Sequence, residues 1–169
     1  MALATHTETT EVSDSPLAIK PGYLEALSLI ERLHRQLLDV IKDELERRSE
    51  LEVNSVQALM LFNIGDQELT AGELRTRGHY LGSNVSYNLK KLVELGFIHH
   101  ERSDADRRAV CIRLAEKGQV IRRLVASLFE RQLTSLRPVG NLSPEDFQAM
   151  NRSLRRLERF WLDQVRYRL

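Results

Sequence analysis

One stretch of the chain decides its fold: Leu81-Gly-Ser-Asn-Val-Ser-Tyr-Asn-Leu-Lys-Lys-Leu-Val-Glu-Leu-Gly96, followed by Phe97-Ile-His-His-Glu-Arg-Ser-Asp-Ala-Asp-Arg-Arg-Ala-Val-Cys-Ile-Arg-Leu114. Its first half has apolar residues at helical spacing, which predicts a short helix that buries Val85, Leu89, Leu92 and Val93. Gly96 stands where a glycine commonly ends a helix. In the second half, Val110, Ile112 and Leu114 alternate with polar residues, as in a half-buried strand. The stretch therefore predicts a helix followed by a two-stranded hairpin.

The other faces of this helix carry small polar, amide, phenol and ammonium groups, on Ser83, Asn84, Ser86, Tyr87, Asn88, Lys90 and Lys91. Such groups contact base edges and phosphates in the major groove of DNA. The hairpin tip, Asp104-Ala-Asp-Arg-Arg108, places two arginines where they can reach an adjacent groove. We interpret the whole stretch as a winged helix-turn-helix that binds DNA.

Each of these contacts has a structural alternative. Tyr87 is suited to packing on its own helix as well as to DNA, and Lys90 and Lys91 are suited to simple solvation. One of Arg107 and Arg108 is expected at the minor groove, while the other pairs with Asp104 or Asp106 and so supports the wing. The sequence leaves open which arginine has which role.

The rest of the chain is predicted to be mainly helical. Residues 1–16 are polar and acidic, which favours a disordered tail. Residues 51–118 are expected to form the winged helix-turn-helix domain, with a helix over 54–64, a short strand over 68–70, and a helix opened by Thr70 and Glu73 as a capping box. Residues 17–50 and 119–169 are expected to form a helical dimerisation region, with helices from 21 to about 49, from 116 to the break at Pro138, and from Ser143 onward.

The last predicted helix has an apolar stripe formed by Phe147, Met150, Leu154, Leu157, Trp161 and Val165. This stripe follows a DNA-reading unit that is already complete, and a long apolar stripe needs a partner. The predicted fold is therefore mainly α with a small β-wing, a winged helix-turn-helix domain with N- and C-terminal dimerisation helices. A symmetric dimer would bind a pseudo-palindrome with half-sites about 10 bp apart.

Charge is segregated along the chain although the net charge is only +1. Residues 1–69 carry 6 Lys/Arg and 13 Asp/Glu, residues 70–118 carry 9 and 6, and residues 119–169 carry 10 and 5. The acidic first third thus masks a basic remainder, and this distribution permits a cationic DNA-binding face.

These residues resemble the MarR family of bacterial transcription regulators, over roughly Tyr23 to the C-terminus. Asp104-Ala-Asp-Arg-Arg108 is similar to the family's D-x-x-D-R-R wing motif, and Leu114-Ala-Glu-Lys-Gly118 resembles its L-T-x-K-G, with Ala115 in place of the threonine cap. Residues 68–74 and 82–92 look most like an alphaproteobacterial, LdtR-like branch. The resemblance implies a cytoplasmic, DNA-bound homodimer on the bacterial nucleoid whose first and last helices interlock.

The same resemblance implies control by a small, often aromatic or phenolic, effector between the dimer helices and the winged domain. The residues expected to line that site are His34, Leu38, Gln57, Met60 and Asn63. Apolar walls with a few polar groups suit such ligands. The alternative is that each of these side chains simply fills the core.

Other classes of function find little support in the sequence. The glycines form no phosphate-binding loop, and no nucleophile with a base is evident, so we expect neither an enzyme nor a cofactor. Cys111 has no resolving partner, and His99 and His100 point to opposite faces of a strand, so we expect neither a redox sensor nor a metal site. No signal peptide or membrane span is evident. The remaining alternative is a winged-helix module that binds proteins without DNA specificity.

Overall fold

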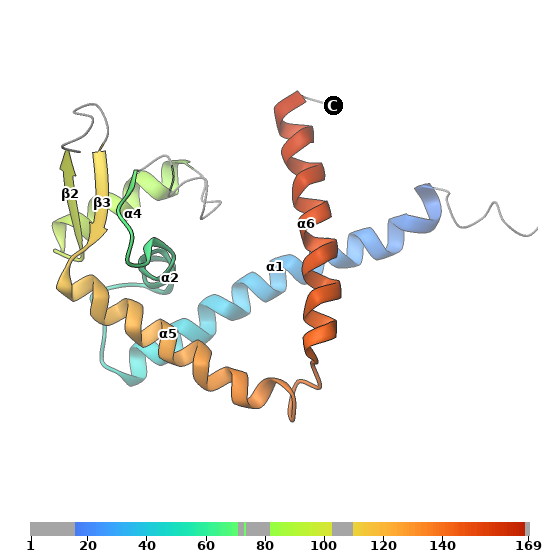
Figure 1. The fold of residues 1–169 in the computed structure, drawn as a ribbon, viewed down its shortest axis with the longest axis horizontal. Helices are drawn as coiled ribbons and strands as arrows, with labels where there is room; N and C mark the ends of the chain where they lie inside the picture. Colours follow the sequence, from blue (N-terminus) through green and yellow to red (C-terminus); the bar gives the residue numbers. More distant parts are fainter. Residues whose placement is uncertain (1–15, 71–72, 74–81, 103–109, 168–169) are drawn as a thin grey trace, which may run out of the picture. The chain divides into compact units, whose positions relative to one another are not determined.

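The computed structural model describes residues 16–70, 73, 82–102 and 110–167 (Figure 1). The chain forms two compact units, Met1–Arg122 and Arg123–Leu169. In chain order the described elements are α1 (Pro16–Arg47), α2 (Ser55–Ile64), β1 (Leu69–Thr70), α4 (Gly82–Glu94), β2 (Ile98–Arg102), β3 (Val110–Leu114), α5 (Glu116–Leu136) and α6 (Pro144–Tyr167). The fold is mainly helical with a small sheet, as predicted. The disordered tail predicted for residues 1–16 lies outside the described residues, apart from Pro16.

Helix α1 begins earlier than predicted. It starts at Pro16 and continues through Pro21, whereas the sequence pattern placed its start at residue 21. Proline suits the first position of a helix because its missing N–H would have no partner there, and Pro21 costs only one backbone hydrogen bond near the same end. At the other end, Ser49 has a φ of 58°, and the backbone N–H of Glu50 donates to the carbonyl of Leu45 at 2.9 Å. This left-handed cap ends the helix where the sequence predicted.

Helix α2 begins with a reciprocal cap. The side chain of Asn54 accepts a hydrogen bond from the backbone N–H of Gln57 at 2.9 Å, and the side chain of Gln57 accepts one from the backbone N–H of Asn54 at 3.0 Å. The apolar content of this short helix is high, and Met60, Leu61 and Ile64 are fully buried. Helix α2 packs against α1, whose C-terminal half contributes Ile41 and Leu45 to the same core.

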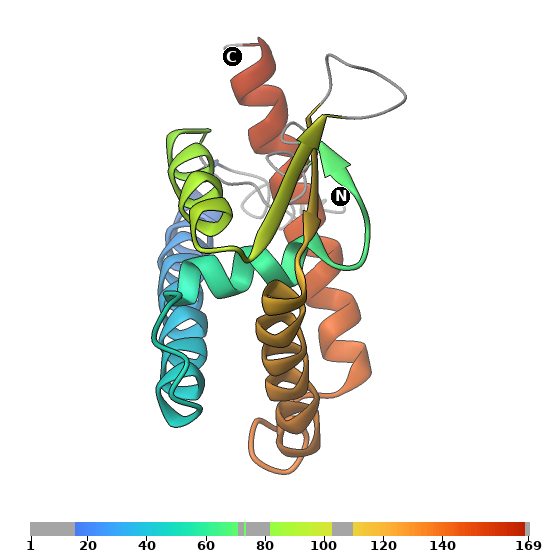
Figure 2. The ribbon, with the colours of Figure 1, turned by 90° about the vertical axis from the view of Figure 1, so that its left-hand side faces the viewer.

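The three strands form one antiparallel sheet in the order β1-β3-β2. Leu69 pairs with Ile112, and Ile112 pairs in turn with His100. The short strand predicted at residues 68–70 is thus present and extends the wing hairpin to three strands. In Figure 2, α4 lies on the β2 side of the sheet and β1 forms the opposite edge. The helix predicted to open at Thr70 and Glu73 falls almost entirely outside the described residues, and only Glu73 is seen as helical.

The ends of α5 and α6 follow the sequence signals. Helix α5 ends at Leu136, before Pro138, and Asn141 in the following turn has a φ of 51°. Ser143 then caps α6, because its hydroxyl accepts a hydrogen bond from the backbone N–H of Asp146 at 3.2 Å. The Asp146 carboxylate accepts one from the backbone N–H of Ser143 at 2.8 Å, which completes a reciprocal cap. None of the helices in these ranges is long and apolar enough to cross a membrane.

Candidate nucleic-acid interface

Helix α4 has one buried face and one exposed face, as the helical spacing predicts. Leu89 and Leu92 are buried and Val93 is half-buried, while Ser86, Tyr87, Lys90 and Lys91 are exposed. The side chains of Val85, Ser83 and Asn84 lie outside the described part, although their backbone belongs to α4. The buried face holds the helix, and the exposed face is accessible to solvent.

Tyr87 is the most prominent side chain of the exposed face. It is 69% exposed, which argues against the alternative that it packs on its own helix. An aromatic ring held outward on a helix combines a large contact area with a hydrogen-bonding hydroxyl. Tyr87 can therefore stack on or donate to a nucleic acid.

Lys90 and Lys91 share one acidic neighbour. Their Nζ atoms lie 4.0 and 3.9 Å from the carboxylate oxygens of Glu94, in pairs that are largely exposed. Exposed pairs of this kind contribute at most about 1 kcal/mol. One carboxylate cannot neutralise two ammonium groups, so this end of α4 stays cationic and suited to phosphate.

Asn88 departs from the sequence prediction. It was expected among the outward-reaching polar side chains, but it is only 9% exposed and is engaged in an interaction. Asn88 precedes the buried Leu92 by four positions, and residues four apart share one face of a helix. The structure thus places Asn88 with the inner face.

The wing tip lies outside the described residues. This applies to Arg107 and Arg108, the predicted DNA contacts, and to Asp104 and Asp106, the predicted supports. The strands that carry the tip, β2 and β3, are described and pair over their full length from Ile98↔Leu114 to Arg102↔Val110.

The junction between the wing and α5 fixes α4 through its C-cap. Gly96 has a φ of 76°, and the backbone N–H of Phe97 donates to the carbonyl of Leu92 at 2.8 Å, which ends α4. The Phe97 carbonyl accepts from the backbone N–H of Ala115 at 3.0 Å, just before α5 begins. A Cβ on Gly118 would lie 2.2 Å from this same carbonyl oxygen. Only glycine therefore allows the first turn of α5 to approach the end of α4 so closely.

Lys117 was not singled out from the sequence, although it lies in the Leu114–Gly118 motif. Its Nζ lies 4.4 Å from the centroid of the Phe97 ring and also pairs with the Glu52 carboxylate. Its partner Glu52 is far away in the sequence, so the only sequence signal for Lys117 was its place before Gly118 in the motif. Glu44 was also not singled out from the sequence: it is buried, with carboxylate oxygens 3.2 Å from Arg47 and 3.3 Å from Arg48, and the local signal for it was this spacing of three and four residues.

The five predicted effector-site residues have different surroundings. Gln57 and Met60 are buried, and the Gln57 side chain is engaged in the α2 cap. Leu38 is half-buried, whereas His34 and Asn63 are exposed. Within the protomer, Gln57 and Met60 therefore have roles in stabilising the core. Whether the five side chains line a ligand site stays a prediction.

Cys111 is half-buried on β3, where it is paired in register with Thr70 and Glu101. His99 and His100 are exposed and face different partners across the sheet, Arg113 and Ile112. Among the described residues, no three His, Cys, Asp or Glu side chains form a group that could hold a metal ion.

Helix α6 leaves its apolar stripe uncovered in the single chain. None of its described residues is buried, and the stripe residue Val165 is 81% exposed. Met150 and Leu154 are exposed, and Phe147, Leu157 and Trp161 are half-buried. The N-terminal half of α1 behaves in the same way, since Leu17, Leu24 and Leu29 are all exposed.

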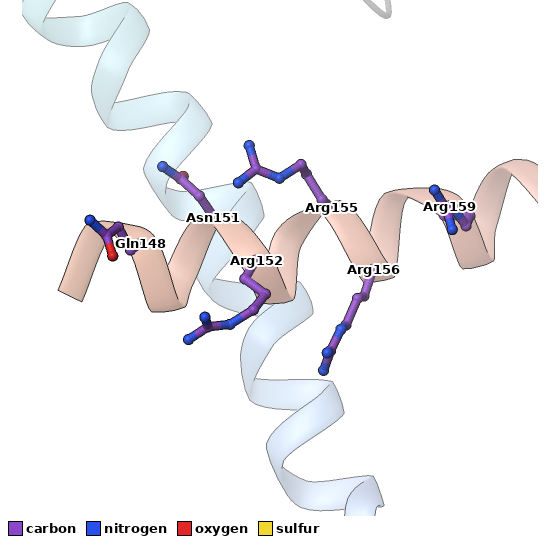
Figure 3. Close-up of a pocket in the computed structure, with 6 residues that line it drawn as sticks. All are labelled: Gln148, Asn151, Arg152, Arg155, Arg156 and Arg159. Atoms are coloured by element: carbon purple, nitrogen blue, oxygen red, sulfur yellow. The ribbon is translucent and has the colours of Figure 1, made fainter. Parts of the chain in front are cut away.

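A different face of α6 is basic. Its side chains line a shallow hollow of about 550 Å³ that consists of Gln148, Asn151, Arg152, Arg155, Arg156 and Arg159. Figure 3 shows Asn151 and Arg155 projecting to one side of the helix, and Arg152 and Arg156 to the other.

Comparison with known proteins agrees with this architecture. A family model described as MarR family matches residues 51–109. The chain is 35% identical over 163 residues to the exopolysaccharide II synthesis transcriptional activator ExpG of Rhizobium meliloti, with 91% of this chain and 82% of that protein covered.

Two solved structures with DNA have the same fold. Streptococcus pneumoniae FabT in complex with DNA matches with a TM-score of 0.64 and 21% identity, over 83% of this chain and 98% of that one. A mutant MarR from E. coli complexed with operator DNA matches with a TM-score of 0.63 and 20% identity, over 85% and 99%. With the winged sheet, the outward face of α4 and a relative this similar over most of its length, the chain belongs to the MarR family of winged-helix transcriptional regulators.

Proposed function

We propose that this regulator acts as a homodimer that binds a specific double-stranded DNA operator on the bacterial nucleoid. The observation that carries the proposal is the division of α4 into a buried face and an exposed face with Tyr87, Lys90 and Lys91. A helix held in this way enters the major groove and reads base edges, while its lysines contact phosphates. One of the wing arginines, Arg107 or Arg108, would border the adjacent minor groove, and the other would pair with Asp104 or Asp106.

The dimer part of the proposal rests on exposed apolar surface. The stripe of α6 and the leucines of the first half of α1 lack cover in one chain, and a second copy is the simplest cover for both. A two-fold dimer presents two α4 helices to half-sites about 10 bp apart on a pseudo-palindrome.

Control by a small aromatic or phenolic effector belongs to the same proposal. The residues concerned are on α1 and α2, which pack against each other; Leu38 on α1 is half-buried and Met60 on α2 is buried. A ligand that separated or tightened these helices would alter the placement of the winged domain. Titration of the operator complex with phenolic acids tests this, and a panel without effect at millimolar concentration would contradict it.

The experiment for DNA recognition is selection of bound fragments from the source genome, followed by filter binding at several salt concentrations. We expect one pseudo-palindromic sequence to be retained much more tightly than random DNA, with log affinity falling linearly against log salt. The alternative, a winged-helix module that binds proteins only, predicts no salt-dependent retention of DNA. Regulators of this family are not enzymes, and we propose no catalytic activity for this chain.

The wing gives the first specific prediction. Replacing both wing arginines, as Arg107→Ala and Arg108→Ala, should lower operator affinity at least tenfold, because phosphate contacts are lost. Each lost contact should also reduce the slope of log affinity against log salt by about one unit. Circular dichroism and sedimentation check that the double variant remains folded and dimeric. Unchanged affinity would remove the wing from the proposed mode of binding.

A further inference from the structure

We propose that the basic face of α6 is a second, sequence-independent contact surface for the phosphate backbone of double-stranded DNA. The surface consists of Arg152, Arg155, Arg156 and Arg159, with Gln148 and Asn151 beside them (Figure 3). This inference rests on the proposed DNA-binding function and extends it to an element outside the winged helix-turn-helix.

The first argument is that these arginines repel one another without compensation. All four are exposed, and none forms an ion pair with another residue in the part of the chain that the structure describes. Arg152 and Arg156 are four positions apart, as are Arg155 and Arg159, and like charges at this spacing destabilise a helix by about 0.2–0.5 kcal/mol per pair. By contrast, the basic residues Lys42 and Lys90 each lie one turn from a paired glutamate. A bound polyanion would remove the repulsion on α6.

The second argument is geometric. Four guanidinium groups lie along seven residue steps, which is about 10 Å of helix. One DNA strand presents a phosphate about every 3.4 Å of rise, so about three phosphates occupy the same length. Guanidinium forks bind phosphate oxygens in pairs, which favours arginine over lysine for such a surface. The charge density of the helix face therefore matches that of a DNA backbone.

The third argument concerns the shape of the surface. Every described side chain that lines the hollow comes from α6, so the described lining runs along one helix as an extended surface. An extended polymer can lie along such a face, whereas a small anion would remain open to water. The arginines also avoid the apolar stripe, because Leu154 and Leu157 differ from Arg155 by 100° or more around a helix of 3.6 residues per turn. A dimer formed through the stripe leaves the basic face accessible.

The test compares two full-length variants of equal charge. The first replaces the four arginines of α6, as Arg152→Gln, Arg155→Gln, Arg156→Gln and Arg159→Gln. The control removes four exposed positive charges from α1, as Lys20→Gln, Arg32→Gln, Arg35→Gln and Lys42→Gln. Affinity for operator and for random duplex of the same length is measured against salt.

We expect the α6 variant to lose at least tenfold in affinity for random DNA at low salt and about two or more units of salt slope. Its preference for the operator over random DNA should rise, because the contacts of α4 with bases remain. A variant with lysine in place of all four arginines should keep most of the slope of log affinity against log salt, because the positive charges remain. The α1 control should change little.

Three results would overturn the inference without overturning the proposed function. One is a slope of log affinity against log salt in the α6 variant that equals the slope of the wild-type protein, while the wild-type protein binds its operator. This result would leave the proposed function standing. Another is an equal loss in the α1 control, which would assign the effect to net charge alone. A third is binding of acidic peptides but not DNA to the α6 face. If the wild-type protein retains no DNA at all, the proposed function fails together with this inference. Should the fourfold variant not remain dimeric, the pairs Arg152→Gln/Arg156→Gln and Arg155→Gln/Arg159→Gln are each expected to remove about half of the slope change.

Discussion

At the scale of single residues, the helix that faces the proposed DNA is positioned by contacts behind it. Phe97 joins the C-cap of α4 to the start of α5, and its backbone carbonyl leaves no space for a side chain on Gly118. Lys117 covers the Phe97 ring and pairs with Glu52, which precedes α2. One short motif therefore connects three helices, and this explains why a lysine and a glycine stand next to each other there.

Gly118→Ala should destabilise the protein, although alanine is normally the better helix former. The added Cβ would lie 2.2 Å from the Phe97 carbonyl oxygen, so the first turn of α5 has to shift, at a cost of about 1–3 kcal/mol. Gly22→Ala in α1 is the matched control, because its Cβ meets nothing within 4 Å and should stabilise the helix by about 0.5–1 kcal/mol. Urea denaturation of both variants checks the prediction. Equal effects at the two sites would contradict it.

Tyr87→Ala should weaken binding to the operator by about 1–3 kcal/mol and binding to random DNA by much less, if the ring reads bases. The matched control is Tyr167→Ala, which removes another exposed tyrosine, from the end of α6. Filter binding on both DNA types measures the difference. Equal losses on operator and random DNA would assign Tyr87 to the backbone instead.

At the scale of whole elements, α6 begins with an ionisable cap. The backbone N–H of Ser143, and secondly its hydroxyl, hold the pKa of the Asp146 carboxyl below its ordinary value of 3.8. A carboxylate with a lowered folded-state pKa stabilises the fold fully above its unfolded pKa, and this contribution is lost as the pH falls through the folded-state value. The cap of α6 is therefore present at neutral pH and is lost only in acid.

The corresponding prediction compares the wild-type protein with Asp146→Asn. Above about pH 5 the wild-type protein should have the higher Tm, because only the carboxylate accepts strongly from the Ser143 N–H. The difference in Tm should shrink as the pH falls below 3.8. Other carboxylates titrate equally in both proteins, so a difference in Tm that does not vary with pH would show that Asp146 is not part of the cap.

At the scale of the whole molecule, much apolar surface of the single chain is uncovered. The α6 stripe and the first half of α1 contribute part of this surface, and burial of one large apolar side chain contributes roughly 1.5–3 kcal/mol. Several such side chains per protomer can exceed the entropy lost on association. We therefore expect dimerisation and DNA affinity to be lost together, since two weak half-site contacts then act separately.

Leu154→Glu tests whether the α6 stripe forms the dimer interface, and Leu162→Glu is its control. Leu154 belongs to the stripe and is 41% exposed, whereas Leu162 is 55% exposed and lies outside the stripe on the same helix. A buried charge at position 154 in both protomers should raise the dimer dissociation constant at least a hundredfold, and Leu162→Glu should change it little. Sedimentation velocity at micromolar concentration measures both. A dimer that survives Leu154→Glu would exclude the stripe as the interface.

The sequence by itself determined the elements and most of their ends. Periodicity, caps and turn residues act between neighbours in the chain, so the helices, the wing strands, the Gly96 cap and the Ser143 start could all be predicted. It also predicted that one face of α4 would be buried and that Tyr87 and the two lysines would stand on the other.

Only the tertiary structure decided what lies behind those elements. Asn88 is polar and was placed outside, yet it is buried, because packing against the domain determines how wide the inner face of α4 is. The pairing of Lys117 with Glu52 joins residues 65 positions apart, which no local pattern can encode. The start of α1 at Pro16 shows the same limit, since a proline inside the first turns weakens the local signal without preventing the helix. Local sequence determines which hydrogen bonds a segment can make with itself, whereas long-range packing decides which side chains lose water and which remain available to DNA.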